Sequence, residues 1–173
     1  MFEKGELKMN KLIKKIACAV MAFTLIAGVF TGCKAKTAVT TAELPGFTSV
    51  KDPSGNLPAK GTVGDMAYTI LEKEQYGCYN KSRGYYIDQL EQLDSPYFIV
   101  ITSGTQTATG ADVKITDFGM QGSTLVIVVE ETKASGEKYK GLDCPCAVLE
   151  VDHLSADLLI VSTTGDQFNL IEM

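Results

Sequence analysis

The run TLVIVVEE, residues 124–131, decides the fold. Successive side chains of a β-strand point to opposite faces, so residues two apart share a face. Leu125, Ile127 and Val129 fall on one face of the run, and two further valines fall on the other. This period of two, in a stretch rich in β-branched residues, predicts a strand.

Runs of the same kind lie on both sides of it. Residues 97–102 read YFIVIT, a continuous apolar run that predicts a strand buried on both faces. Residues 112–118 and 147–151 alternate between apolar and polar side chains, which predicts strands with one inward face.

Three further segments complete the expected architecture. Residues 158–162 and 167–171 are joined by TTGD, which predicts a hairpin. Residues 67–73 predict a strand, with a short helix capped by Asp65 as the alternative. The spacing of apolar residues in 86–93 predicts one or two helical turns. The expected fold is therefore mostly β, a small antiparallel sandwich or partly open barrel with at most one short helix.

The N-terminus carries a different signal. Three lysines within residues 9–15 precede an apolar run, residues 16–31, that holds no charge. This order is typical of a secretory signal peptide, and the run is shorter than the about 20 residues of a membrane span. We expect residues 1–32 to be a signal peptide with its true start at Met9. An uncleaved N-terminal helix and an ordinary secreted protein are the alternatives.

The apolar run ends in Phe30-Thr31-Gly32-Cys33, which resembles the lipobox of bacterial lipoproteins. Phe30 departs from the aliphatic residue usual at the first lipobox position. The resemblance implies that Cys33 receives a diacylglyceryl group and becomes the first residue of the mature chain. Two acyl chains attach a protein stably to a membrane, whereas one binds marginally. The expected location is the extracytoplasmic face of a bacterial cell membrane.

The net charge of the chain limits the kinds of molecule that it can bind by electrostatic attraction. The chain has 16 Lys and Arg against 21 Asp and Glu, and without residues 1–32 the balance is 11 against 19, a net charge of -8. An acidic chain does not bind nucleic acid or anionic lipid by charge alone. Residues 33–64 are rich in Thr, Ala, Ser, Gly and Pro, which predicts a flexible tether, with residues 44–50 as an irregular edge of the folded domain as the alternative. The folded domain is then expected at residues 65–173.

Three stretches carry a resemblance to a known family: YFIVITSGTQ (97–106), TATGADVKI (107–115) and DCPCAVLEV (143–151). They resemble the C-terminal domain of the PrcB family, the lipoprotein subunit of a secreted protease complex. The match spans residues 97–151, and a Thr-Gly-Gly-Tyr turn of the family keeps only Gly110 here. The resemblance implies a non-catalytic accessory protein that binds an exported protease or another exported protein. Its candidate binding turn is Gly104, Gln106, Thr107, Thr109, Gly110 and Asp112.

Gly110 has a simpler interpretation beside this one. Glycine is the usual residue where a turn requires a positive φ, so backbone geometry alone can account for Gly110.

No motif points to catalysis or to a cofactor. The one histidine, His153, has no nucleophile placed beside it by any motif, and strand-end histidines usually face solvent. We therefore expect neither an enzyme nor a cofactor or metal site. The alternative function is a surface lipoprotein that binds a small molecule or glycan for a transporter or sensor. A deep apolar pocket with convergent polar groups would favour that alternative.

Cysteine gives a further candidate site. After Cys18 leaves with the signal peptide and Cys33 is acylated, three cysteines remain. Cys144 and Cys146 share one side of a strand about 7 Å apart, which disfavours a bond between them. A disulfide of Cys78 with either one is sterically open, and three buried thiols are the alternative.

Tyr85 and Tyr86 lie in a segment that is rich in tyrosine and glycine. Exposed tyrosines often form contact surfaces, which makes these two candidate contact aromatics. Packing against the sheet edge, with the hydroxyl groups in water, is the alternative.

Overall fold

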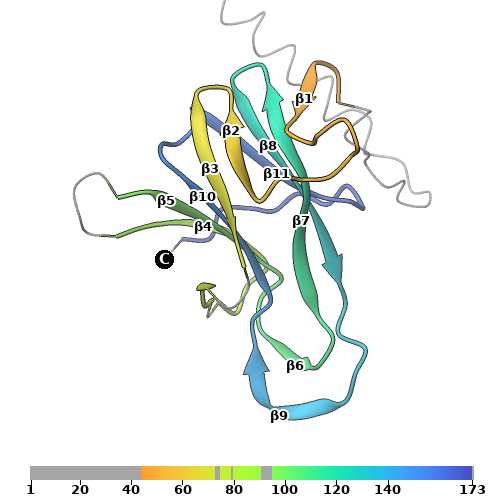
Figure 1. Ribbon diagram of the computed structural model, residues 1–173. Coiled ribbons are helices and arrows are strands. Elements are labelled where there is room, and N and C mark those ends of the chain that lie inside the picture. The colour runs from red at the N-terminus through yellow and green to blue at the C-terminus, as the bar shows by residue number, and fades with distance from the viewer. Residues whose placement is uncertain (1–43, 73–74, 79, 91–94, 173) are drawn as a thin grey trace, which may run out of the picture. The chain divides into compact units, whose positions relative to one another are not determined.

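The chain folds into two β-sheets and a separate two-stranded ribbon (Figure 1). The structure, a computed structural model, describes residues 44–72, 75–78, 80–90 and 95–172. Its strands are β1 (Phe47–Ser49), β2 (Lys60–Val63), β3 (Met66–Leu71), β4 (Gly84–Gln89), β5 (Tyr97–Thr102), β6 (Gln106–Ala108), β7 (Asp112–Gln121), β8 (Thr124–Thr132), β9 (Lys138–Asp143), β10 (Cys146–Val151) and β11 (Asp157–Ser162). The predicted mostly-β fold is confirmed.

The strand order explains why no barrel forms. One sheet has the order β1-β7-β8-β11, a second has β2-β3-β10-β5-β4, and β6 pairs with β9 alone. β11 runs parallel to β8, while the other paired strands run antiparallel. Within the described residues, no strand pairing joins the two larger sheets, so they remain separate.

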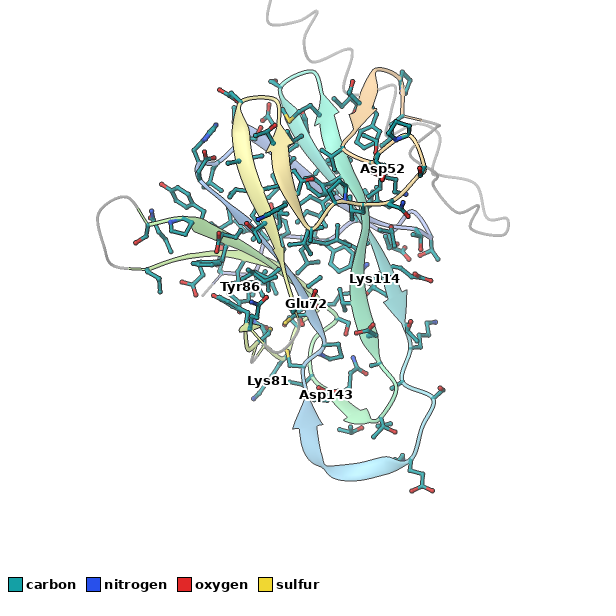
Figure 2. The ribbon with its side chains drawn as sticks, in the orientation of Figure 1. Asp52, Glu72, Lys81, Tyr86, Lys114 and Asp143 are labelled. Atoms are coloured by element: carbon teal, nitrogen blue, oxygen red, sulfur yellow. The ribbon has the colours of Figure 1, made fainter. Side chains whose placement is uncertain are left out.

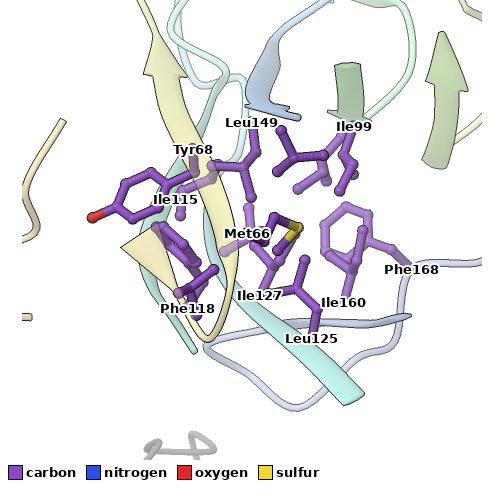
Figure 3. Close-up of a cluster of buried hydrophobic side chains, with 14 of the residues drawn as sticks. Met66, Tyr68, Ile99, Ile115, Phe118, Leu125, Ile127, Leu149, Ile160 and Phe168 are labelled. Carbon is purple, nitrogen blue, oxygen red and sulfur yellow. The ribbon is translucent and has the colours of Figure 1, made fainter. Parts of the chain in front are cut away.

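The main core contains the predicted inward face of β8. Leu125, Ile127 and Val129 are at most 1% exposed and pack with Phe118 of β7 and Leu149 of β10. Figure 3 shows this cluster with strands on both sides of it. Phe118 meets Tyr68 edge-to-face with ring centroids 4.6 Å apart, a favoured aromatic geometry. The alternation read in the sequence therefore corresponds to real burial.

A second, smaller core lies on the opposite face of the five-stranded sheet. Ile99 and Ile101 of β5 belong to the main core, whereas Phe98 and Val100 belong to the smaller one. The prediction that residues 97–102 are buried on both faces is thus confirmed. Tyr76, from the connection between β3 and β4, packs on Phe98 with ring centroids 5.3 Å apart and hydrogen-bonds to Asp88 of β4. This connection therefore crosses the outer face of the sheet and covers it.

The C-terminal segment covers the edges of two strands. Phe168 N–H donates to Ile160 O of β11 at 2.9 Å. On the other side, Tyr85 N–H of β4 donates to Asn169 O at 2.9 Å, and Ile171 N–H donates back to Tyr85 O at 2.7 Å. The predicted hairpin is therefore half right: residues 158–162 form a strand, but residues 167–171 divide their hydrogen bonds between two sheets.

Two local predictions are settled by pairing with distant strands. Residues 66–71 form β3, so the helix capped by Asp65 is wrong. The helical turns expected from residue 86 are also wrong as far as Gln89, because β4 pairs with β5 along its length. The spacing of Leu90 favoured the helix, but its side chain is 58% exposed and is not part of the buried core. Residues 91–94 lie outside the described part.

The folded domain begins earlier than expected. Part of the predicted tether, from residue 44 to residue 64, contains β1 and β2, which pair with β7 and β3. Asp117 anchors this region, since its buried carboxylate accepts a 2.6 Å hydrogen bond from Ser49 Oγ and lies 3.6 Å from Lys51 Nζ. Gly119 allows the contact, because a Cβ there would lie 2.0 Å from Thr48 O. The tether assignment is therefore wrong for residues 44–64.

The signal peptide, Cys33 and the rest of the tether lie outside the described residues. No helix within residues 44–172, as far as the structure describes them, is long and apolar enough to cross a membrane.

Candidate functional site

The candidate binding turn lies on the β6–β9 ribbon and its connections. Figure 1 shows this ribbon at one end of the domain, beyond the two larger sheets. Gln106 pairs with Asp143 and Ala108 pairs with Lys138, with an irregularity in register between the two pairs. The candidate binding turn therefore comprises β6 and the residues on either side of it.

The residues of this turn differ in exposure. Thr107, Thr109, Gly110 and Asp112 are exposed, whereas Gly104 is buried and Gln106 is half-buried. Gln106 Nε2 donates to Ser103 O at 3.3 Å, so its side-chain amide is hydrogen-bonded to the backbone of the same turn. The surface that a partner can reach consists of the four exposed residues.

Two glycines shape the ends of the turn. Gly110 has a φ of 86°, which confirms its interpretation as a positive-φ turn residue. Gly104 has a φ of 78°, and a Cβ there would lie 2.7 Å from Lys81 O. Gly104 therefore lets the base of the ribbon approach the connection that covers the outer sheet face.

Backbone hydrogen bonds hold the turn in place. Thr109 O accepts the N–H groups of Ser135 at 3.2 Å and Gly136 at 2.9 Å, and Thr109 N–H donates to Glu137 O at 3.2 Å. The connection between β8 and β9 thus fixes the backbone at Thr109 and Gly110. The side chains displayed here sit on an ordered turn.

The ribbon also offers strand edges. β6 and β9 pair only with each other among the described strands, so each has an outer edge without a neighbouring strand. The edges of β4 and β11, by contrast, are hydrogen-bonded to the C-terminal segment. Open strand edges are surfaces on which another chain can add a strand.

The three cysteines gather at the base of the same ribbon, on the outer face of the five-stranded sheet. Cys78 Sγ and Cys144 Sγ are 3.1 Å apart as free thiols, with Cys144 donating to Cys78. Cys146 at the start of β10 also hydrogen-bonds to Cys78. In Figure 2 the labelled Tyr86, Lys81 and Asp143 lie around this region. The structure therefore brings Cys78 beside both of its predicted partners.

Thr102 organises the cluster, and sequence reasoning missed it. Its hydroxyl lies 3.3 Å from Cys144 Sγ, donates to Pro145 O at 3.0 Å and accepts from Gly104 N–H at 3.0 Å. Thr102 is the last residue of β5 and pairs with Cys146 of β10. One feature of the sequence could have indicated this role: Thr102 is a polar residue at the end of an apolar strand, and it lies on the same face as Phe98 and Val100.

Hydrogen bonding and burial set the acidities of the cluster. A hydrogen bond from Cys146, and a further one from Cys144, lower the pKa of Cys78 against the opposing effect of burial. Burial raises the pKa of Cys144. Burial, with the charge of Cys78, also raises the pKa of Tyr86. The cluster therefore favours a thiolate at Cys78, with protonated donors around it.

Tyr85 and Tyr86 do not form a shared exposed surface. They are consecutive in β4 and so point to opposite faces. Tyr86 is 8% exposed in the smaller core beside the cysteines, and Tyr85 is half-buried against the main core. The prediction of an exposed contact aromatic is wrong for Tyr86, which is buried; for the half-buried Tyr85 it stays a prediction.

Tyr85 lines a hollow between the edges of the two sheets. The hollow has a volume of about 260 Å³, and its walls include Leu125, Leu158 and Leu170. Its polar wall residues include Ser155, which already donates to Ser123 O at 2.7 Å, and Asp157. Ligand pockets are usually larger and carry convergent polar groups. The hollow therefore gives little support to the alternative of a ligand-binding protein.

His153 lies at the far end of β10 from the cysteines. Its Nδ1 is 2.8 Å from Asp152 Oδ1, its Nε2 is 3.5 Å from Asp65 Oδ1, and its side chain is 47% exposed. This is the strand-end position expected from the sequence. Among the residues that the structure describes, no group of three or more His, Cys, Asp or Glu side chains is arranged to hold a metal ion.

Comparison of this chain with protein-family models, with curated proteins and with solved structures found no match.

Proposed function

We propose that this protein is a lipid-anchored, extracytoplasmic protein-interaction module that docks an exported protein through its β6–β9 ribbon. The observation that carries the proposal is the ribbon itself, a two-stranded sheet with open edges that displays Thr107, Thr109 and Asp112. The resemblance to the PrcB family suggests an exported protease as the partner. In this function the protein acts as a non-catalytic accessory or stabilising subunit.

The shape of the ribbon supports docking over a purely structural role. A two-stranded sheet buries little apolar surface and adds little stability by itself. Among the described residues, the largest fully buried side chains, such as Phe118 and Leu125, lie on strands of the two larger sheets, apart from Phe168 in the C-terminal segment. An ordered, polar extension that the core does not need is well suited to contact another chain.

The polar character of the ribbon also fits an exported partner protein. Interfaces that form between separately folded proteins are about as polar as the rest of a protein surface. Strand addition at β6 or β9 would supply backbone hydrogen bonds, and the threonines beside it would contact partner side chains. The acidic balance of the chain adds no attraction for nucleic acid.

Anchoring is the second part of the proposal. A diacylglyceryl group on Cys33 would hold the domain at the membrane, with residues 34–43 as a short spacer before the described domain. We expect the intact mass of membrane-extracted protein to equal that of a chain beginning at lipidated Cys33. We expect Cys33→Ser to lose membrane attachment. An unmodified Cys33 in membrane-extracted protein would contradict the anchor without bearing on the ribbon.

Docking is tested with two matched threonine variants. Thr107 on β6 and Thr62 on β2 are both exposed strand threonines. Each is changed to Arg in a chain tagged after Met173, and partners are recovered from native membranes and quantified by mass spectrometry. We expect Thr107→Arg to lower recovery of one exported partner at least tenfold, while Thr62→Arg leaves it unchanged. Equal recovery with both variants, or the lack of a stoichiometric partner with the wild-type chain, would refute docking through the ribbon.

A further inference from the structure

We propose that Cys78, Cys144 and Cys146 form a thiol–disulfide exchange site, in which Cys78 and Cys144 are oxidised to a disulfide by an external disulfide and Cys146 can exchange into that bond. The site lies outside the exposed part of the ribbon. The proposal requires neither the lipid anchor nor the docking partner.

Topology brings the three thiols together from distant parts of the chain. Cys78 lies in the connection between β3 and β4, whereas Cys144 and Cys146 flank Pro145 at the start of β10. All three belong to or pack against the smaller core with Phe98 and Val148. Their meeting is therefore produced by the folded state and does not follow from closeness in sequence.

The sulfur geometry favours a bond between Cys78 and Cys144. The two Sγ atoms are 3.1 Å apart, and a disulfide needs about 2.05 Å. The two sulfur atoms therefore lie within about 1 Å of bonding distance. Asn80 restrains Cys144 from the same connection, since its N–H donates to Cys144 Sγ at 3.4 Å. The connection that carries Cys78 is thus already held against Cys144.

The first step of the exchange needs an accessible thiol, and Cys144 is the more exposed of the pair. Cys144 transfers its proton to Cys78 along their hydrogen bond. The Cys144 thiolate attacks one sulfur of an external disulfide, RS–SR′, the S–S bond breaks and R′S⁻ leaves. A mixed disulfide, Cys144–S–S–R, remains.

The second step closes the internal bond. R′S⁻ takes up the proton from Cys78, which becomes a thiolate again, and this thiolate attacks Cys144 Sγ. The Cys78–Cys144 bond forms and RS⁻ leaves. Two electrons have passed from the protein to the external disulfide, which is the oxidant. The hydrogen bonds that stabilise the Cys78 thiolate also suit it to this resolving role.

Cys146 makes the bond exchangeable. It is buried in the same cluster as Cys78, whose sulfur the disulfide would use. A Cys146 thiolate can attack Cys78 Sγ and release the Cys144 thiolate, with no net oxidation or reduction. Cys144 and Cys146 are two residues apart and remain a poor pair for a direct bond.

The test uses the full-length chain with Cys18→Ser and Cys33→Ser, so that only the three domain thiols react. The chain is equilibrated with mixtures of reduced and oxidised glutathione, quenched by alkylation and mapped by mass spectrometry. We expect one free thiol and a Cys78–Cys144 bond under oxidising conditions. The native equilibrium constant should exceed that in denaturing urea by on the order of 100-fold, the ratio that a stabilising disulfide implies. Three free thiols, a Cys144–Cys146 bond or equal constants would overturn the proposal.

Single variants test the exchange part. We expect Cys144→Ser to form a Cys78–Cys146 bond, and Cys146→Ser to keep the Cys78–Cys144 bond. Cys78→Ser should form only mixed disulfides with glutathione. Two free thiols in Cys144→Ser under the conditions that oxidise the parent chain would show that Cys146 cannot exchange.

Discussion

Replacing Thr102 with Val should destabilise the base of the ribbon, although the side chain hardly changes in shape. Thr102 is fully buried, and its hydroxyl accepts the N–H of Gly104 and donates to Pro145 O. Val removes these bonds and leaves the buried N–H of Gly104 without its acceptor. Pro145 O still accepts Ser103 N–H at 3.3 Å, so the loss falls mainly on Gly104.

The size of the effect follows from that one unsatisfied group. A buried donor without a partner costs about 1–3 kcal/mol, which is the expected decrease in the free energy of unfolding. At about 4 °C per kcal/mol for a domain of this size, the Tm should fall by about 4–12 °C.

Urea denaturation of the reduced wild type and the variant measures this change, and hydrogen exchange locates it. Thr62→Val on the exposed surface of β2 is the matched control and should change the free energy of unfolding by less than about 0.5 kcal/mol. Exchange of the Gly104 amide should accelerate in Thr102→Val and stay slow in Thr102→Ser, which keeps a hydroxyl. An unchanged Gly104 exchange rate in Thr102→Val would refute the assigned role of the hydroxyl.

Three further changes have defined outcomes. Gly110→Ala should lower the free energy of unfolding by about 1–2 kcal/mol because of its positive φ, and Gly104→Ala should lower it more because its Cβ also meets Lys81 O; equal losses in urea denaturation would contradict this. Phe118→Ala should lower the free energy of unfolding by about 3–5 kcal/mol, and a loss below about 1 kcal/mol would contradict its fully buried position. Alkylation of Cys78 should show a midpoint below the usual thiol pKa of about 8.5, because its lowered pKa keeps the thiolate populated as pH falls; a midpoint at or above that value would disagree.

The strands of the core could be predicted from the sequence because burial leaves a local pattern. The alternation in residues 124–131 and the apolar run in residues 97–102 each record which faces are covered. The helical spacing near Ile87 misled because pairing with β5 outweighs a weak local preference. The C-terminal segment carried no pattern that could show its contacts with both β4 and β11.

The candidate site was predictable to a similar extent. Residues 104–112 were chosen as a candidate binding turn from the resemblance alone, and they form β6 with its flanking turns, but their role in binding stays a prediction. The choice of partner for Cys78 stayed open, because residue spacing cannot place a residue from a distant connection. Thr102 was missed because its role depends on Pro145 and Cys144, which reach it only through the pairing of β5 with β10.

Docking through the ribbon is tested most directly by placing a photoreactive amino acid at Thr107, with Thr62 as the control position, in the full-length chain in its native host. Both sites are exposed on strands, so they differ mainly in location. On illumination, position 107 should cross-link to one exported protein in high yield, and position 62 should not. No adduct at position 107, or the same adduct in equal yield at position 62, would contradict the ribbon as the docking surface.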